Sequence, residues 1–165
     1  MNIGILTISD RSSRGERPDA SGPALAEVIA AQGWGVARTD VIPDELELIK
    51  FTLSAWADSK DLDVILTAGG TGFAPRDVTP EATRAVLERL TPGLDEAMRA
   101  ASLKVTPHAM LSRAVSGIRK HTLIVNLPGS PKGAMENLQV ILPVLEHAVQ
   151  LLSDDPSGEK SHLAR

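Results

Sequence analysis

The sequence contains no cysteine and no tyrosine, and it has only two tryptophans and two phenylalanines among its 165 residues. Without cysteine the chain cannot form a disulfide, a thiolate metal site or an iron–sulfur cluster, and it has no thiol nucleophile. Any chemistry must therefore use oxygen and nitrogen groups. The scarcity of aromatic side chains also removes the stacking surfaces on which single-stranded nucleic acids bind.

Basic charge is also in short supply. Seventeen lysines and arginines stand against 21 aspartates and glutamates, which gives a net charge of -4. Nucleic-acid-binding domains usually carry a basic stripe, so we expect no nucleic-acid partner. No run of 18 apolar residues occurs, and the first residues lack the basic and apolar segments of a secretion signal. We therefore expect a cytoplasmic protein with no membrane partner.

Short apolar runs rich in β-branched residues predict buried strands at residues 3–8, 63–67 and 122–126. Residues 35–42 are more polar and predict a strand nearer an edge. Helical spacing of apolar residues predicts helices around 25–29, 46–56, 82–90, 94–105 and 134–152. Pro143 lies inside the last of these and should kink it.

This alternation of strands and helices predicts an α/β fold with three layers, doubly wound, in which a mainly parallel sheet has helices on both faces. We expect one domain over residues 1–152 and a polar, frayed tail over 153–165. Such sheets bind ligands beyond the carboxyl ends of their strands. The segments that follow Ile8, Ala68 and Leu127 are therefore the candidate site.

The segment after Ile8, Ser9–Arg17, is polar and carries Asp10 and the arginines Arg11 and Arg14. It can hold a phosphate, or it can be a solvated loop whose serines and aspartate cap their own turns. The sequence leaves both interpretations open.

The segment after Ala68 contains Gly69, Gly70 and Gly72 within four residues. Glycines let the backbone approach a ligand closely and turn its N–H groups inward, as in an anion-binding nest, although a tight turn explains them equally well. Neither the Walker pattern nor the dinucleotide-binding pattern is present. We expect Thr79 to cap the following helix, with Pro80 at its first position.

The segment after Leu127 leads directly into the last helix. Ser130 should be the N-cap and Pro131 the first helical residue, and the same helix N-terminus suits a phosphate. The stretch 112–119 is predicted to be a polar loop, and its arginines and hydroxyls either bind an anion or face solvent. The four histidines show no ligand spacing, so no zinc site is expected.

Asp44 and Asp77 both lie near predicted strand-to-helix junctions. Asp44 can be an N-cap that forms a capping box with Glu47, or it can face the ligand edge. If both aspartates face that edge, their oxygens suit Mg²⁺, with substrate phosphates and waters completing its coordination.

Four phrases resemble a known family: residues 7–10, residues 69–83, residues 111–113 together with 116–119, and residues 126–130. In order and spacing they are similar to the molybdenum-cofactor biosynthesis family, which includes bacterial molybdopterin adenylyltransferase and the G domains of gephyrin and its plant relatives. The resemblance spans roughly residues 3 to 152. The loop over 11–20 is short, as in the bacterial members, so receptor binding of the gephyrin kind is not expected.

The resemblance implies an enzyme, a nucleotidyltransferase that takes ATP and molybdopterin as substrates and Mg²⁺ as cofactor. Its family transfers AMP to the terminal phosphate of molybdopterin and releases pyrophosphate, and many members are homotrimers. A transient contact with the molybdate-insertion enzyme would then complete the cofactor.

The site residues implied by the resemblance fall into two groups. Asp44 and Asp77 match the aspartates that act in catalysis and bind the metal. The proposed substrate- and nucleotide-binding residues are Ser9, Asp10, Gly69, Gly70, Thr71, Gly72, Arg76, Ser102, Ser112, Arg113, Pro128, Gly129 and Ser130. Arg11, Arg14 and Lys132 are further candidates for neutralising phosphate charge.

Two alternatives of other classes remain at this point. One is a non-catalytic paralogue of the same fold that holds molybdopterin or a nucleotide without transferring AMP. The other is an assembly or scaffold domain whose ligand edge contacts a protein. The presence of both Asp44 and Asp77 favours the enzyme.

Overall fold

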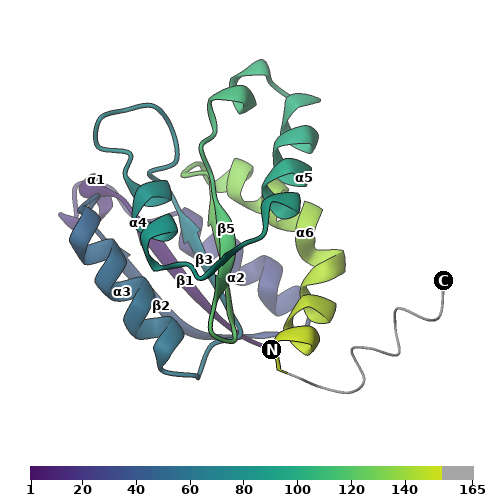
Figure 1. The fold of residues 1–165 in the computed structure, drawn as a ribbon. Coiled ribbons are helices and arrows are strands. Elements are labelled where there is room, and N and C mark those ends of the chain that lie inside the picture. Colours follow the sequence, from purple (N-terminus) through teal and green to yellow (C-terminus); the bar gives the residue numbers. More distant parts are fainter. Residues whose placement is uncertain (154–165) are drawn as a thin grey trace.

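The computed structural model describes residues 1–153, in which a six-stranded sheet lies between two layers of helices (Figure 1). The strands are β1 (Asn2–Ile8), β2 (Gly35–Ile42), β3 (Val64–Ala68), β4 (Arg89–Leu90), β5 (Ser116–Arg119) and β6 (Thr122–Leu127). The helices are α1 (Asp10–Ser13), α2 (Ser21–Ala31), α3 (Leu46–Asp58), α4 (Thr79–Val86), α5 (Pro92–Leu103), the 3-10 helix η1 (Pro107–Leu111) and α6 (Pro131–Leu152). The predicted three-layer α/β fold is confirmed.

The strands are ordered β2-β1-β3-β6-β5-β4. The first four are parallel, β5 is antiparallel to β6, and β4 is antiparallel to β5. The chain moves from β1 outward to β2 and then returns to β3 on the other side of β1. The connections therefore diverge between β1 and β3, which is where open α/β sheets bind ligands. The carboxyl ends of the four parallel strands share one edge, called the ligand edge below.

Each face of the sheet carries its own apolar core. Helices α2, α5 and α6 pack on one face, and α3 and α4 pack on the other. Along β1 the side chains alternate, so Ile5 joins the first core and Leu6 the second, and both are almost fully buried. Burial on both faces explains why β1, β3 and β6 read as continuous apolar runs.

The two antiparallel strands were missed in the sequence. Strand β5 occupies part of the stretch 112–119 that was predicted to be a loop, because Ser116–Arg119 has no apolar alternation and is defined by its pairing with β6. Leu90 was assigned to a helix, but α4 ends at Val86 and Leu90 lies in β4. Val105 likewise lies beyond the end of α5 and is exposed.

Helix α6 begins as predicted. The N–H of Gly133 donates to Ser130 Oγ at 3.2 Å, and Pro131 is the first helical residue. Pro143 lies inside the helix, which continues through it to Leu152. That residue is also the predicted end of the single domain; of the predicted frayed tail, all but Ser153 lies outside the described residues. None of the helices within residues 1–153 combines the length and the apolar character needed to span a bilayer.

Candidate functional site

The loops at the ends of β1, β2 and β3 are joined by side chains at the ligand edge. The N–H of Asp10 donates to Asp44 Oδ2 at 2.8 Å, and the N–H of Asp44 donates to Asp10 Oδ1 at 3.1 Å. From the third loop, Arg76 donates two hydrogen bonds to the Asp10 carboxylate, at 2.9 and 3.0 Å, and one to Glu45 Oε1 at 2.8 Å. The three loops thus form one connected network.

Arg76 is the centre of this network. Its hydrogen bonds lower the pKa of Asp10 below the usual range for a carboxyl, and the two carboxylates raise the pKa of Arg76 further above its already high value. The charge of Arg76, which was predicted to bind phosphate, is already matched by Asp10 and Glu45. In the described structure Arg76 ties loops together.

Asp44 is not the N-cap of α3, contrary to one of the two interpretations of the sequence. Glu45 occupies that position, without a side-chain capping bond, and no capping box forms. The Asp44 carboxylate instead accepts from Asp10. Burial raises the pKa of Asp44, and the nearby charges of Asp10 and Asp77 raise it further, against the lowering effect of the Asp10 N–H.

The segment between β3 and α4, residues 69–78, is called the glycine loop. At Gly69 and Gly70 it lies so close to neighbouring segments that there is no room for a side chain. Gly69 and Gly70 have φ of 115° and 63°, in the region that favours glycine. A Cβ on Gly69 would lie 2.2 Å from the carbonyl oxygen of Ile8. On Gly70 it would lie 2.3 Å from Thr79 Oγ1 and 2.9 Å from Asp44 Oδ1. The close contacts of Gly69 and Gly70 are with protein atoms, and their predicted approach to a ligand stays a prediction.

Thr79 differs from its predicted role as a cap. Val78 precedes the first residue of α4 as its N-cap, and Thr79 is the first helical residue. Its hydroxyl is buried and has no hydrogen-bond partner among the described residues. The Thr79 N–H donates to the carbonyl of Gly70 at 3.2 Å, so the start of α4 is bound to the glycine loop through the backbone.

Asp77 folds back on the loop that carries it. Its Oδ2 accepts from the N–H of Ala74 at 2.9 Å, and a Cβ on Gly72 would lie 2.9 Å from the same oxygen. Asp44 therefore lies beside Gly70 and Asp77 lies beside Gly72. The two predicted acids meet at one short loop, although they come from the ends of different strands.

The two carboxylates fit magnesium better than a metal whose ligands all come from protein side chains. Each aspartate uses Oδ2 for a backbone N–H, and its Oδ1 accepts no hydrogen bond from the part of the chain that the structure describes. Within residues 1–153 no cluster of three His, Asp or Glu side chains could hold a metal. Mg²⁺ is commonly held by one or two carboxylates together with substrate phosphates and water, which is what Asp44 and Asp77 can provide.

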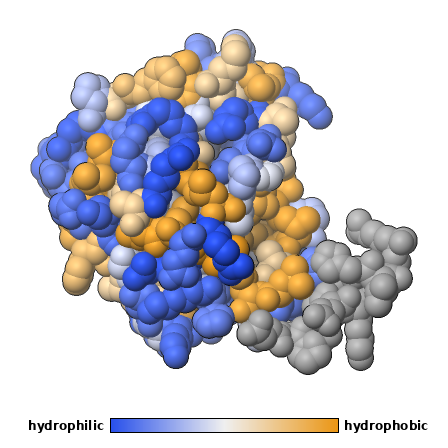
Figure 2. Space-filling model, in the orientation of Figure 1, coloured by the Kyte–Doolittle hydropathy of each residue, from blue (hydrophilic) through white to orange (hydrophobic). Residues whose placement is uncertain are grey.

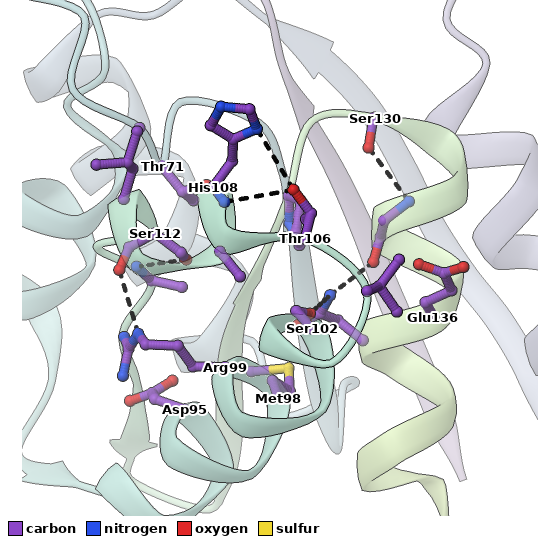
Figure 3. Close-up of a pocket in the computed structure, with 18 residues that line it drawn as sticks. Thr71, Asp95, Met98, Arg99, Ser102, Thr106, His108, Ser112, Ser130 and Glu136 are labelled. Carbon is purple, nitrogen blue, oxygen red and sulfur yellow. Dashed lines mark hydrogen bonds between the residues drawn. The ribbon is translucent and has the colours of Figure 1, made fainter.

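A cavity of about 290 Å³ lies beside the glycine loop (Figure 3). Helices α5 and α6, the segment around η1, the glycine loop and the β6–α6 turn line it. It collects six of the predicted site residues: Thr71, Gly72, Ser102, Ser112, Pro128 and Ser130. Asp44 and Asp77 are not among the lining residues, but Gly72, which lies beside Asp77, is one of them.

Several cavity residues were missed in the sequence. On α5, Asp95 and Arg99 line the cavity below Ser102, and Arg99 Nε donates to the carbonyl of Ser112 at 3.4 Å (Figure 3). Burial raises the pKa of Asp95. The spacing of 95, 99 and 102 places the three on one face of a helix, and that polar stripe was the available signal. His108 and Asn137 also line the cavity, and no pattern in the sequence pointed to them.

The remaining predicted residues have local roles. Ser9 Oγ accepts from the N–H of Ser12 and caps α1, so at Ser9 the capping interpretation of the first loop is confirmed. The carbonyl of Gly129 accepts from the hydroxyl of Ser21, which attaches the β6–α6 turn to α2. Arg113 donates to carbonyl oxygens of the glycine loop.

The three additional basic candidates lie at the surface. Arg14 forms an ion pair with Glu16, and Lys132 Nζ lies 3.8 Å from Glu136 Oε1. Arg11 is exposed on α1. The cavity wall itself contributes Arg99 as a cation.

Apolar side chains flank the mouth of the site. Val105, Met110 and Leu111 are exposed near the end of α5 and on η1, and Phe73 is 66% exposed in the glycine loop. Figure 2 shows apolar surface at the upper end of the molecule, where α5 and η1 lie.

Comparison with known proteins gives a consistent result. The family described as "Probable molybdopterin binding domain" matches residues 4–147. The molybdopterin adenylyltransferase of Helicobacter pylori strain J99 is 42% identical over 154 residues, which cover 92% of this chain and 88% of that protein. Gephyrin of Dictyostelium discoideum is 45% identical over 99% of this chain, which spans only 24% of gephyrin's length. The chain likewise spans 26% of the cinnamon protein of Drosophila melanogaster.

Solved structures agree with the sequence relatives. The molybdopterin biosynthesis enzyme MoaB of Thermus thermophilus superposes with a TM-score of 0.88 at 55% identity, covering 94% of this chain and 98% of that one. The molybdopterin biosynthesis Mog protein of Mycobacterium ulcerans gives 0.85 at 39% identity, with coverages of 92% and 98%.

Proposed function

Because the chain belongs to the molybdopterin-binding domain family, we propose that it acts in molybdenum cofactor biosynthesis as a molybdopterin adenylyltransferase. One structural observation carries the proposal. Asp44 and Asp77 lie beside the same glycine loop, and two residues of that loop, Thr71 and Gly72, line a cavity. A polyanion that lies across the loop would reach the acids and the cavity together.

In the proposed reaction, an oxygen of the terminal phosphate of molybdopterin attacks the α-phosphorus of ATP. The bond between the α-phosphorus and the oxygen that bridges to the β-phosphate breaks, and pyrophosphate leaves. The reaction brings several negative charges together, so positioning and charge stabilisation are the main requirements. Backbone N–H groups of the glycine loop and of the N-terminus of α6 would bind phosphate oxygens.

Asp44 and Asp77 would hold Mg²⁺ through the oxygens that no backbone N–H occupies. When bound, the metal neutralises the phosphates and stabilises the charge that develops on the departing group. Arg99, in the cavity wall, would neutralise further phosphate charge. The hydroxyls of Ser102 and Ser112 face the same space and would hydrogen-bond to the substrate (Figure 3).

The direct test is incubation of the purified protein with molybdopterin, ATP and Mg²⁺. We expect adenylylated molybdopterin and pyrophosphate in equal amounts, both dependent on Mg²⁺. Asp44→Ala and Asp77→Ala should abolish both products while leaving the fold intact by circular dichroism. Tight binding of molybdopterin without either product would instead identify a binding paralogue. A scaffold would form neither product, and Asp44→Ala and Asp77→Ala would then leave cellular molybdoenzyme activity intact.

We also propose that the protein assembles as a homotrimer and contacts the molybdate-insertion enzyme transiently. The exposed apolar side chains beside the site are suited to such contacts. Light scattering during size-exclusion chromatography would give the oligomer mass, and a monomer would contradict the first part. The cytoplasmic location stays a prediction.

A further inference from the structure

Arg113 connects the two halves of the site. It follows the cavity-lining Ser112, and its backbone N–H donates to the carbonyl of Thr71 at 2.9 Å. Its Nε donates to the carbonyl of Gly72 at 2.7 Å, and its Nη2 donates to the carbonyl of Asp77. One side chain therefore binds the loop at both ends of the segment that leads from the glycines to Asp77.

The remaining terminal nitrogen of Arg113 is also engaged. Nη1 donates to Glu81 Oε1 in the first turn of α4, so all three guanidinium nitrogens bind protein acceptors. The side chain is one-third exposed, at 33%. A planar guanidinium can bridge two carbonyls and a carboxylate at once, whereas the compact ammonium of lysine cannot reproduce that fork.

We propose that Arg113 is a positioning residue that fixes Asp77 relative to the cavity, and that it does so in place of the phosphate contact expected from the sequence. The importance of that position rests on the proposed function, since Asp77 is the acid to be placed. The hydrogen bonds from Arg113 to the glycine loop and to Glu81, called the clamp, are observed independently of that function.

Hydrogen exchange of the loop amides tests the clamp without any substrate. The N–H groups of Ala74, Asp77 and Thr79 all donate within the loop or to its first residues, at 2.9, 2.8 and 3.2 Å. In Arg113→Ala we expect these amides to exchange about tenfold faster or more, because several charge-assisted hydrogen bonds are lost. Arg113→Lys should behave similarly. Arg84→Ala, which removes an exposed cation from α4, is the matched control and should leave these rates unchanged.

Glu81→Gln distinguishes a clamp role of Arg113 from a phosphate-binding role, because the two roles predict different changes in the affinity for Mg-ATP. If Arg113 is a clamp, losing the carboxylate loosens the loop, so exchange rises and the affinity for Mg-ATP by calorimetry stays equal or falls. If Arg113 binds phosphate, the variant releases its charge toward the ligand and Mg-ATP binds more tightly. Tighter binding in Glu81→Gln, or unchanged exchange in Arg113→Ala, would overturn the proposal.

Kinetics then separate this inference from the proposed function. With adenylylation present, Arg113→Lys should lower kcat by about tenfold or more with little change in KM for ATP, because the variant misplaces Asp77 and leaves the binding of ATP intact. If the wild type forms no product while the loop exchange responds as expected, the clamp stands and the proposed function fails. Should Arg113→Ala fold poorly, Arg113→Lys and Glu81→Gln give the same comparisons.

Discussion

The backbone N–H groups of Asp10 and Asp44 each donate to the other residue's carboxylate, at 2.8 and 3.1 Å. This reciprocal pair fastens the loop after β1 to the loop after β2. It also holds the Asp44 carboxylate in a partly buried place near two other acids, which is why the pKa of Asp44 is raised. A carboxylate kept there in the free protein is unfavourable for folding and favourable for binding a cation.

Asp44→Asn should therefore stabilise the free protein while inactivating it. A carboxyl whose pKa is raised by folding loses stability as pH rises through that pKa, so at pH 7 the neutral amide is the better tolerated group. We expect a higher Tm at about pH 7, no gain below about pH 4, and a loss of adenylylation of about 100-fold or more. Scanning calorimetry and product assays measure the two effects. Asp40→Asn, an exposed change on β2, is the control.

Gly70→Ala should lower the unfolding free energy more than the same substitution at another glycine of positive φ. At Gly70 the new methyl group would meet the hydroxyl of Thr79 and the Asp44 carboxylate. We expect the unfolding free energy to fall by about 2–4 kcal/mol and the adenylylation activity to be lost. Gly33 has φ of 74° and nothing within 4 Å of the added Cβ, so Gly33→Ala should cost only about 1 kcal/mol. Equal losses in urea titrations of the two variants would contradict this account.

Asn126, at the ligand-edge end of β6, should be essential for stability. It is fully buried, its Nδ2 donates to the hydroxyls of Thr67 and Thr83 at 2.9 Å each, and its Oδ1 accepts from the N–H of Val115. Asn126→Ala should lower the unfolding free energy by about 2–4 kcal/mol, since buried polar groups lose their partners. Thr67→Val should cost less than Asn126→Ala, because it removes only one of those bonds. Chemical denaturation with m-values checks both.

The ion pair between α3 and β5 should govern acid stability. Arg119 donates to both oxygens of Asp58, at 2.9 and 2.8 Å, and with Lys120 it lowers the pKa of Asp58 to about 2. The unfolded chain, with a carboxyl pKa near 3.8, then takes up the proton first as pH falls. This contribution should be complete above about pH 4 and lost between about pH 4 and 2. In Asp58→Asn, denaturation midpoints should fall less steeply over that range.

Arg119→Gln provides the cross-check for that ion pair. If the acid dependence comes from this pair, the single variants and the double variant should show the same reduced slope. An unchanged slope in Arg119→Gln would assign the dependence to another group.

Much of the site's location could be read from the sequence because it depends on local pattern. The apolar runs of β1, β3 and β6 indicated where the parallel strands end, and the glycines after Ala68 marked a place of close backbone approach. Prediction failed for β4 and β5, whose residues carry no apolar period. Strand β5 is defined by its pairing with β6, and β4 by its pairing with β5.

Individual side-chain roles were less accessible. Arg76 and Arg113 were both assigned to phosphate, because an arginine in a loop shows only its charge. In the structure, carboxylates and carbonyls from distant segments occupy them. Asp95 and Arg99 were missed because helical spacing alone does not tell which face meets a cavity.

By itself the sequence determined the layered α/β class, the ligand edge and the residue types available there, since these follow from apolar periodicity and glycine geometry along neighbouring residues. Only the tertiary structure decided which acids meet at the glycine loop, which arginines are already paired and which helix face lines the cavity. Those outcomes depend on contacts between residues far apart in the chain, and local sequence patterns do not show which distant segments come together.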